Sequence, residues 1–309
     1  MRIIAPFAFL VIILFPAYGQ INNYEVSAGA QFGFVHGQSL ELVYPIPNDT
    51  KGELLSELKW DMKPVFYYGI NIDFEKIDLL SSPGFFISAS FKAGIPAVSG
   101  TMEDRDWQSE ESDALTNFSS HDNKTQRLFM ADLITGASIP IKSLLYIKPF
   151  ISGSWMHFYF SGRDGYGKYA SRNWETIEFN GEVITYRQDW FLFATGFSIG
   201  TEILRPFTFD LSFKISPLTY CNATDEHLIR SMTFKDFTSF GLYLEPACSV
   251  SLNIKRFELS LEFAYRYIGR TRGKSYIKGE NTGKYFISEN DAGAGLSILD
   301  TRFLVIFHF

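Results

Sequence analysis

The chain lacks the features by which many exported proteins and enzymes are recognised. Beyond residue 19 it has no uninterrupted apolar run of the roughly 18 to 20 residues that a membrane-spanning helix needs. It contains no nucleophile-elbow serine motif, glycine-rich phosphate loop or redox cysteine pair. Two cysteines, Cys221 and Cys248, are too few for a disulfide scaffold, and the sequence leaves open whether they pair. A net charge of −6 argues against a nucleic-acid partner.

The first residues of the chain indicate export. Residues 1–19 combine one arginine, a central apolar run and two small residues, Ala17 and Gly19. This pattern is typical of a secretory signal peptide that is cleaved near Gly19, with an uncleaved membrane anchor as the alternative. No linker, composition break or repeat divides the remainder. We therefore expect a signal peptide at 1–19 and one mature domain at 20–309.

Apolar and polar residues alternate along much of the chain. Between Pro206 and Pro217, apolar residues occupy every second position, with Thr, Asp, Ser and Lys between them, and 256–269 repeats the pattern. The chain is 17% aromatic and contains 31 phenylalanines. Such strands suit a wall between lipid and a polar lumen. An exported chain without a spanning helix crosses a membrane as a closed sheet or is a secreted β-protein, and the alternation favours the membrane.

We predict an all-β fold, a ten-stranded antiparallel transmembrane β-barrel with long extracellular loops. Its first strand is expected to bend at Gly37, and the chain ends in an aromatic, as outer-membrane barrels commonly do. The strands are predicted at 22–47, 57–74, 84–100, 125–141, 144–162, 183–203, 206–221, 238–254, 256–271 and 293–309. The long polar loops are predicted at 45–57, 101–125, 163–183, 219–238 and 271–292.

Two short polar pairs stand out in these long connections. Asp104 and Asp106 are two residues apart, and so are Asp225 and His227. In extended backbone this spacing puts both side chains of a pair on one face. Both pairs belong to the long-loop side of the predicted barrel. We expect the four side chains to face each other across its mouth and to activate a water molecule.

With these features placed, the chain resembles the omptins, a family of ten-stranded outer-membrane endoproteases. GTMEDRDW at Gly100–Trp107 is similar to the segment that carries the two catalytic aspartates of the family. DEH at Asp225–His227 matches the motif with its catalytic aspartate and histidine. LELVYP at Leu40–Pro45 resembles the early strand whose glutamate, here Glu41, lines the pocket for a basic P1 side chain, the residue before the cleaved bond.

The resemblance implies an aspartic-type endopeptidase in the outer membrane, with its site outside the cell and no metal cofactor. Its expected substrates are proteins or peptides, cut near basic residues. His227 would act as the general base, and Asp225 would orient its ring and stabilise the imidazolium. Asp104 and Asp106 would hold the attacking water and donate to the developing oxyanion. Because neighbouring carboxyls do not both ionise easily, one of them should have a raised pKa.

The chain also departs from the family pattern. Ala223 stands where the family commonly has a second acid in the P1 pocket, and Asn117 stands near a position where many members have an aspartate. These losses should weaken selection for paired basic residues, while Glu41 keeps a preference for Arg or Lys. Positions that grip lipopolysaccharide in the family align near His157 and Asp189. Outer-membrane lipid is an expected partner, but dependence on lipopolysaccharide is not.

Other interpretations remain open from the sequence. The aspartates and His227 could ligate zinc or calcium, although no tight metal-ligand spacing occurs. His121 could assist the site or be an ordinary loop residue, and Glu41 could instead pair with Lys59 or Arg266 in the barrel wall. A non-enzymatic adhesin or receptor on the same scaffold is the alternative function. A small porin is a further one, although side chains largely fill a narrow ten-stranded lumen.

Overall fold

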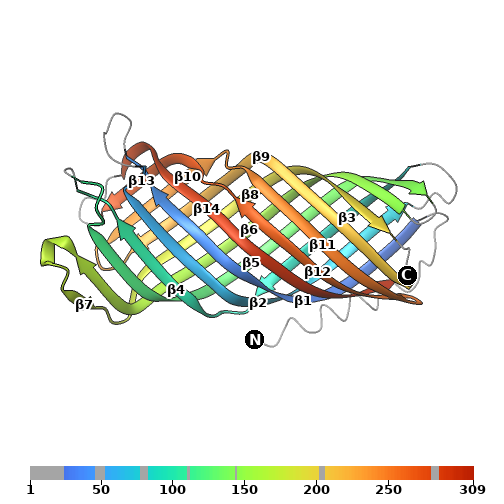
Figure 1. The fold of residues 1–309 in the computed structure, drawn as a ribbon, viewed down its shortest axis with the longest axis horizontal. Coiled ribbons are helices and arrows are strands. Elements are labelled where there is room, and N and C mark those ends of the chain that lie inside the picture. The colour runs from blue at the N-terminus through green and yellow to red at the C-terminus, as the bar shows by residue number, and fades with distance from the viewer. Residues whose placement is uncertain are drawn as a thin grey trace.

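A closed antiparallel sheet forms the molecule (Figure 1). The computed structural model describes residues 24–45, 53–76, 83–109, 112–142, 145–201, 206–279 and 285–309, and the predicted signal peptide at 1–19 lies outside them. Its elements are β1 (Tyr24–Val43), β2 (Ser56–Lys76), β3 (Gly84–Gly94), β4 (Ala97–Asp106), β5 (Asn117–Lys142), β6 (Leu145–Tyr169), η1 (Ala170–Arg172), β7 (Thr176–Glu178), β8 (Glu182–Thr201), β9 (Phe207–His227), β10 (Met232–Ser239), β11 (Tyr243–Ile254), β12 (Phe257–Ile268), β13 (Arg272–Gly279) and β14 (Tyr285–His308). Among the described residues, no helix has the length and apolar character to span a membrane.

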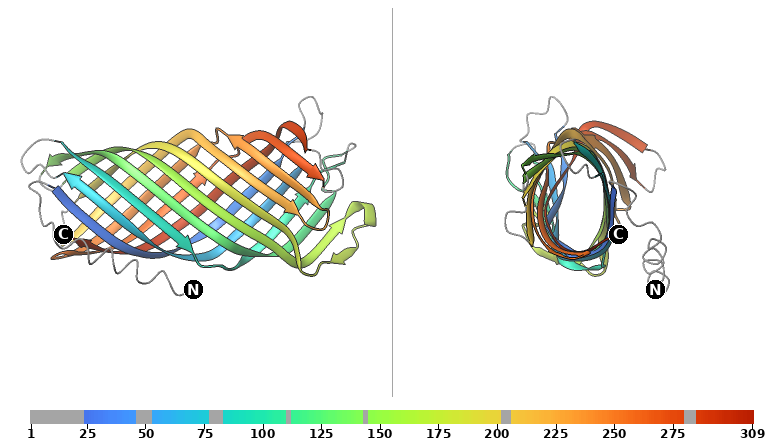
Figure 2. Two further views of the ribbon diagram at one scale, coloured as in Figure 1. Left: turned by 180° about the vertical axis from the view of Figure 1, so that it is seen from behind. Right: turned by 90° about the vertical axis from the view of Figure 1, so that its right-hand side faces the viewer.

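These strands form a ring of ten, as predicted. The order runs β1, β2, β3, β5, β6, β8, β9, β11, β12 and β14, and β14 pairs with β1 to close the ring. β4 continues the course of β3, β10 runs into β11, and β12 runs into β13, while the short β7 pairs only with β6. The end-on view in Figure 2 shows the closure. The predicted bend of the first strand is confirmed by a register shift between Val35 and Gly37.

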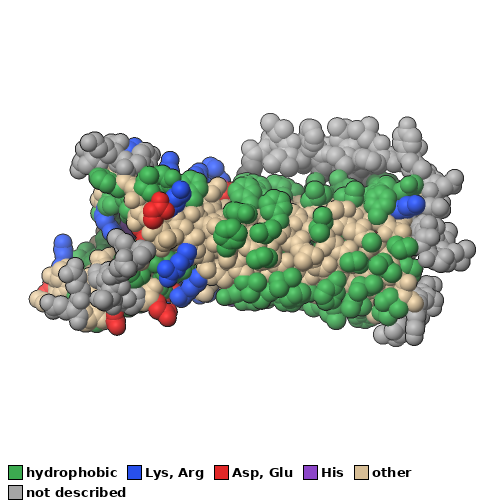
Figure 3. Space-filling view, turned by 90° about the horizontal axis from the view of Figure 1, so that it is seen from above, with side chains coloured by type: hydrophobic (Ala, Val, Ile, Leu, Met, Phe, Trp, Pro, Cys, Tyr) green, Lys and Arg blue, Asp and Glu red, His purple; other side chains and the backbone are tan. Residues whose placement is uncertain are grey.

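The outside of the barrel carries an apolar belt. On β9, Phe207, Phe209 and Leu211 are 42%, 41% and 65% exposed, while Lys214 is buried inside. This is the alternation predicted for a wall between lipid and lumen. Outward positions are apolar up to Tyr220 and polar from Asn222 onward, so the strand leaves the belt there. Figure 3 shows the same division: hydrophobic side chains cover most of the length, and charged ones gather at one end.

Inside the belt, charged side chains fill the middle of the lumen. Arg266 contacts Asp132 at 3.2 Å and Glu245 at 2.8 Å, and Lys92 pairs with Asp300. All five residues are buried. Buried charges are tolerated when each has a partner of opposite sign, as these do. The network therefore fills the lumen at the level of the belt.

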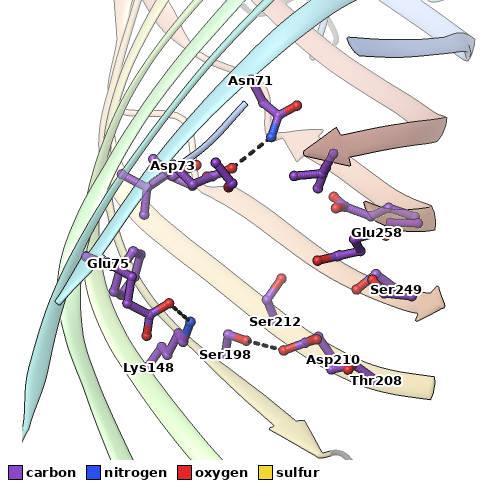
Figure 4. Close-up of a pocket in the computed structure, with 18 of the residues that line it drawn as sticks. Asn71, Asp73, Glu75, Lys148, Ser198, Thr208, Asp210, Ser212, Ser249 and Glu258 are labelled. Carbon is purple, nitrogen blue, oxygen red and sulfur yellow. Dashed lines mark hydrogen bonds and ion pairs between the residues drawn. The ribbon is translucent and has the colours of Figure 1, made fainter. Parts of the chain in front are cut away.

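A polar cavity of about 1520 Å³ occupies the end that holds the carboxy terminus. Figure 4 shows its side chains, among them the ion pair of Lys148 with Glu75 at 2.8 Å. Glu25 and His308 also line it and contact each other at 2.5 Å. The cavity lies at the opposite end of the barrel from the two polar pairs singled out in the sequence.

The barrel wall continues well beyond the apolar belt, where long loops were predicted. The predicted loop 101–125 is largely strand, because β4 reaches Asp106 and β5 begins at Asn117. The predicted loop 219–238 is replaced by β9 and β10 with a tight turn between them. These predictions were wrong because they relied on apolar alternation. Outside the lipid, both faces of a strand can be polar while the backbone ladder continues.

Candidate active site

A β-bulge at Gly100 turns two aspartates into the barrel. On β4, the pairing register with β5 shifts at this residue. Before the bulge Ser99 is buried, and beyond it Met102 and Asp106 are buried, so the inward face changes from odd to even positions. Gly100 has a φ of 97°, in the left-handed region that glycine adopts most easily. The bulge therefore places Asp104 and Asp106 on the lumen side.

A second bulge, at Pro217, has the same effect on β9. The register between β8 and β9 shifts here, and β9 contains the extra residue. Ser216 faces inward before the bulge, whereas Thr219 and Asp225 do so after it. Proline lacks the N–H that a central strand would need, so it is suited to a bulge. The second predicted pair, Asp225 and His227, is directed into the lumen in this way.

Asp225 and His227 are in direct contact. The Nε2 atom of His227 lies 2.5 Å from Oδ2 of Asp225. Asp225 is 1% exposed, and the side chain of His227 is 14% exposed. The ring of Phe234 packs edge-on against the imidazole, with 5.4 Å between ring centroids. The imidazole is thus oriented by a buried carboxylate on one side and an aromatic ring on another.

Asp104 and Asp106 differ in environment. Asn117 donates to Asp106 at 2.9 Å, and Ser56 donates to Asp104 at 3.4 Å. Burial, with the negative charge of Asp106 as the next cause, raises the pKa of Asp104 to about 7. One raised pKa in the pair was expected, although burial contributes more than the like charge. Near neutral pH, Asp104 therefore has a carboxyl that can carry a proton.

The two pairs meet in space although about 120 residues separate them in sequence. The charges of both His227 and Asp225 act on the carboxyl of Asp104, and so does that of Arg230. β4 and β9 do not pair with one another, so this proximity arises across the lumen. The structure therefore brings all four predicted side chains to one place, at the polar end of the barrel.

Glu41 lies beside this group. It is on β1, is 4% exposed, and its Oε2 atom has no hydrogen-bond partner in the described part of the chain. Burial, followed by the charges of Asp225 and Asp236, raises the pKa of Glu41 well above that of an ordinary glutamate. In this environment the ionised form of Glu41 is destabilised. A cation bound next to the carboxylate would stabilise that form.

Comparison with known proteins assigns this architecture to a family. The model of the Omptin family matches residues 22–305. The chain belongs to the omptin family. The plasminogen activator of Yersinia pestis is 25% identical over 290 residues, which cover 90% of this chain and 86% of that protein. The crystal structure of the outer membrane protease OmpT from Escherichia coli superimposes with a TM-score of 0.84 at 18% identity, covering 95% of this chain and 99% of that chain, which shows the fold.

As an omptin, the protein is an outer-membrane protease with a barrel fold. It lies in the outer membrane with its active site facing the outside of the cell. Proteins or peptides are the substrates at the level of the family.

The alternative in which Glu41 pairs with a basic residue of the wall is wrong. Lys59 contacts Glu103 at 3.6 Å, and Arg266 contacts Asp132 and other acids of the central network. None of the ion pairs among the described residues includes Glu41.

His121 is engaged elsewhere in the wall of this omptin. It lies on β5 rather than in a loop, is buried, and contacts the Asp164 carbonyl oxygen at 2.5 Å through Nδ1. Its Nε2 is 3.0 Å from the hydroxyl of Ser119. Burial lowers the pKa of His121, which keeps the ring neutral. With both nitrogens occupied, it is a structural residue rather than a member of the site.

Four further residues can be placed. His157 pairs with Asp189 at 2.8 Å, so the positions aligned with lipopolysaccharide contacts hold an ion pair of their own. Cys221 is buried and Cys248 is exposed, and neither forms a disulfide. Across the described ranges, no three His, Cys, Asp or Glu side chains are arranged as a metal site.

Sequence reasoning missed two features near the site. Trp60 stacks between Phe160 and Tyr186, with 5.6 Å between ring centroids on each side. Asp236, on β10, is 6% exposed and lies opposite Ala223 in the strand register. The alternation of residues around Asp236 could have indicated a strand, but this stretch was predicted to belong to the loop 219–238.

Proposed function

We propose that this omptin is an endopeptidase that cuts next to basic residues, using Asp104, Asp106, Asp225 and His227 to activate water. The observation that supports it most is the meeting of the two polar pairs across the lumen, with Asp225 in contact with His227 at 2.5 Å. A buried carboxylate that holds an imidazole is an arrangement suited to general-base catalysis.

The proposed reaction proceeds without a covalent intermediate. Water attacks the peptide carbonyl carbon while His227 accepts its proton, and Asp225 stabilises the resulting imidazolium. Asp104, whose raised pKa leaves it partly protonated near pH 7, donates a hydrogen bond to the oxyanion. Asp106, held by Asn117, helps to position the water. When the C–N bond breaks, the imidazolium returns its proton to the leaving amine.

The proposed selectivity rests on Glu41. Its buried carboxyl lies within the electrostatic influence of Asp225 and Asp104, so a side chain bound against it would be next to the reacting bond. A basic P1 residue would supply the missing positive charge. Because Ala223 and Asn117 stand where the family commonly has acids, we do not propose strict selection for paired basic residues. Lipopolysaccharide is not expected to be required.

The test is to incubate the purified, refolded protein with a peptide library, with and without EDTA, and to map the cut sites by mass spectrometry. We expect cleavage after Arg or Lys that EDTA does not abolish. Asp104→Ala, Asp225→Ala and His227→Ala should each lower the rate by at least about 1000-fold. Asp122→Asn removes an exposed acid on the outer face of β5 and serves as the matched control.

Three results would contradict the proposal. Full activity in the three variants would remove these residues from the reaction. Loss of activity in EDTA would favour the metal alternative. Binding of host proteins without cleavage, unchanged by His227→Ala, would favour the adhesin or receptor.

A further inference from the structure

Two buried acids near the site have no cationic partner. Glu41 on β1 is 4% exposed and Asp236 on β10 is 6% exposed. Neither takes part in an ion pair among the described residues. The polar groups that act on them are the carboxyl of Asp225 for Glu41 and the hydroxyl of Ser275 for Asp236, and neither carries a positive charge. A buried carboxylate without a partner is costly, so such groups are rare in proteins.

At the level of the apolar belt, the buried acids of the lumen are paired with cations. Asp132 and Glu245 contact Arg266, and Asp300 pairs with Lys92. The same lumen thus supplies cations for the acids at the level of the apolar belt and supplies none for Glu41 and Asp236. The difference indicates that the cation for the upper acids comes from a bound molecule.

Glu41 and Asp236 face a common space. The charge of Asp236 acts on the carboxyl of Glu41, and both act on the phenol of Tyr186. Asp225, which contacts the proposed catalytic histidine, acts on both acids as well, so both lie beside the Asp225–His227 pair. Acids from three strands, β1, β9 and β10, therefore converge on it.

The strand register explains why Asp236 can reach this space. Asp236 and Ala223 are direct partners across the β9–β10 ladder, and both are buried. Side chains at such positions have Cβ atoms about 4.5–5.5 Å apart and point to the same face. Because Ala223 ends at its methyl group, it offers the carboxyl of Asp236 neither a hydrogen-bond donor nor a charge.

We propose that Asp236 is a specificity-determining residue of the P1 subsite: with Glu41 it forms a two-carboxylate receptor that selects arginine over lysine. This inference rests on the proposed function. The planar guanidinium offers five N–H donors in a fixed fork and can reach carboxylates from two strands, whereas the lysine ammonium is a compact point charge. The second acid that Ala223 lacks is thereby supplied by the neighbouring strand.

Three peptides that differ only at P1 test the inference. They carry arginine, lysine or citrulline, which has the shape of arginine without its charge. The measured quantity is kcat/KM for the wild type, for Asp236→Asn and for the control Asp122→Asn. Asp236→Asn should lower kcat/KM for the arginine peptide about 10- to 100-fold and change that for the citrulline peptide less than about threefold. The ratio of arginine to lysine should fall, and the control should match the wild type.

A rescue variant separates the subsite from the fold. In Ala223→Asp/Asp236→Asn the carboxylate moves across the ladder to the partner position, so it should return to the same space. We expect it to restore at least about tenfold of the loss for the arginine peptide. Retained mobility as a folded barrel on unheated SDS gels checks each variant, and Asp236→Ser replaces Asp236→Asn if that variant does not fold.

The outcomes distinguish the two proposals. If the wild type cuts after arginine and Asp236→Asn keeps the same ratio of arginine to citrulline, this inference is overturned and the proposed function stands. An equal loss for all three peptides also overturns it, because Asp236 would then support the reaction or the fold and not selection. A wild type that cuts none of the peptides overturns the proposed function and this inference with it.

Discussion

At the scale of single residues, the buried acids around the proposed site lower the stability of the folded protein. Burial raises the pKa of Asp236 to about 7, with Asp225 and Asp291 as further causes, while Ser275 opposes the shift. The raised pKa means that the folded protein resists ionising this carboxyl, whereas the unfolded chain does not. Sites that bind charged groups often carry such costs, since the ligand removes them.

Asp236→Asn should therefore make the barrel more stable. Below about pH 4 the carboxyl is protonated in both folded and unfolded states, so the variant should equal the wild type. Between about pH 4 and pH 7 the carboxyl ionises in the unfolded state but not in the folded state, so the wild type progressively loses up to about 4 kcal/mol that the asparagine variant keeps. Urea unfolding in detergent micelles at pH 4 and pH 8 measures the difference.

Asp132→Asn is the contrasting control for that measurement. It removes a partner of Arg266 in the central network and should destabilise by about 3 kcal/mol or more. An Asp236→Asn barrel that is less stable than the wild type at pH 8 would show that Asp236 has a stabilising partner after all.

The sequence predicted the four proposed catalytic residues because their spacing of two is visible in any extended backbone. It did not predict Asp236, whose importance depends on register. Only the pairing of β9 with β10 places it opposite Ala223. The missing partner of Glu41 was equally hidden, because Arg266 and Lys59 are present in the sequence and find other acids in the fold.

At the scale of elements, two bulges decide which side chains enter the site. The lipid-facing alternation of β3 and β9 was predictable, and it led to ten strands. Alternation counted from Ser99 or Ser216 and carried past Gly100 or Pro217 with unchanged parity would put Asp104 and Asp225 on the wrong face. Proline within a strand is a signal for a bulge, but Gly100 was the last residue of the predicted strand 84–100, and a glycine at a strand end gave no such signal.

Gly100→Ala should displace β4 and with it the side chains of Asp104 and Asp106. A Cβ atom there would lie 2.8 Å from Cβ of Asp61, and the φ of 97° disfavours any other residue. We expect a loss of about 1–3 kcal/mol in unfolding free energy and at least a tenfold lower kcat/KM, because β4 must shift to relieve the contact. Peptide cleavage and urea unfolding of the refolded protein measure both.

Gly181→Ala is the matched control, because Gly181 also has a positive φ, of 85°, but has nothing within 4 Å of the added Cβ. It should lose some stability and keep its peptidase rate. A Gly100→Ala enzyme as active as this control would show that the bulge does not position Asp104.

At the scale of the whole molecule, the lumen is divided into three levels. The proposed site is at the extracellular end, the charge network of Arg266, Lys92 and their acids lies at the level of the apolar belt, and the polar cavity opens at the other end. The sequence predicted a narrow barrel but not this division, because the network joins strands that are far apart in the chain. The division bears on the porin interpretation.

The refolded barrel should not conduct ions. Large buried side chains, including Lys92, Arg266 and Tyr67, occupy the middle of the lumen. They are held in place by contacts with the carboxylates of Asp300, Asp132 and Glu245. An ion crossing this level would have to break those contacts in a lumen that ten strands make narrow. Recordings in planar bilayers should show no stepwise openings under conditions in which a 16-stranded porin gives them. Regular openings of porin size in the wild type would contradict a filled lumen and return the porin interpretation to consideration.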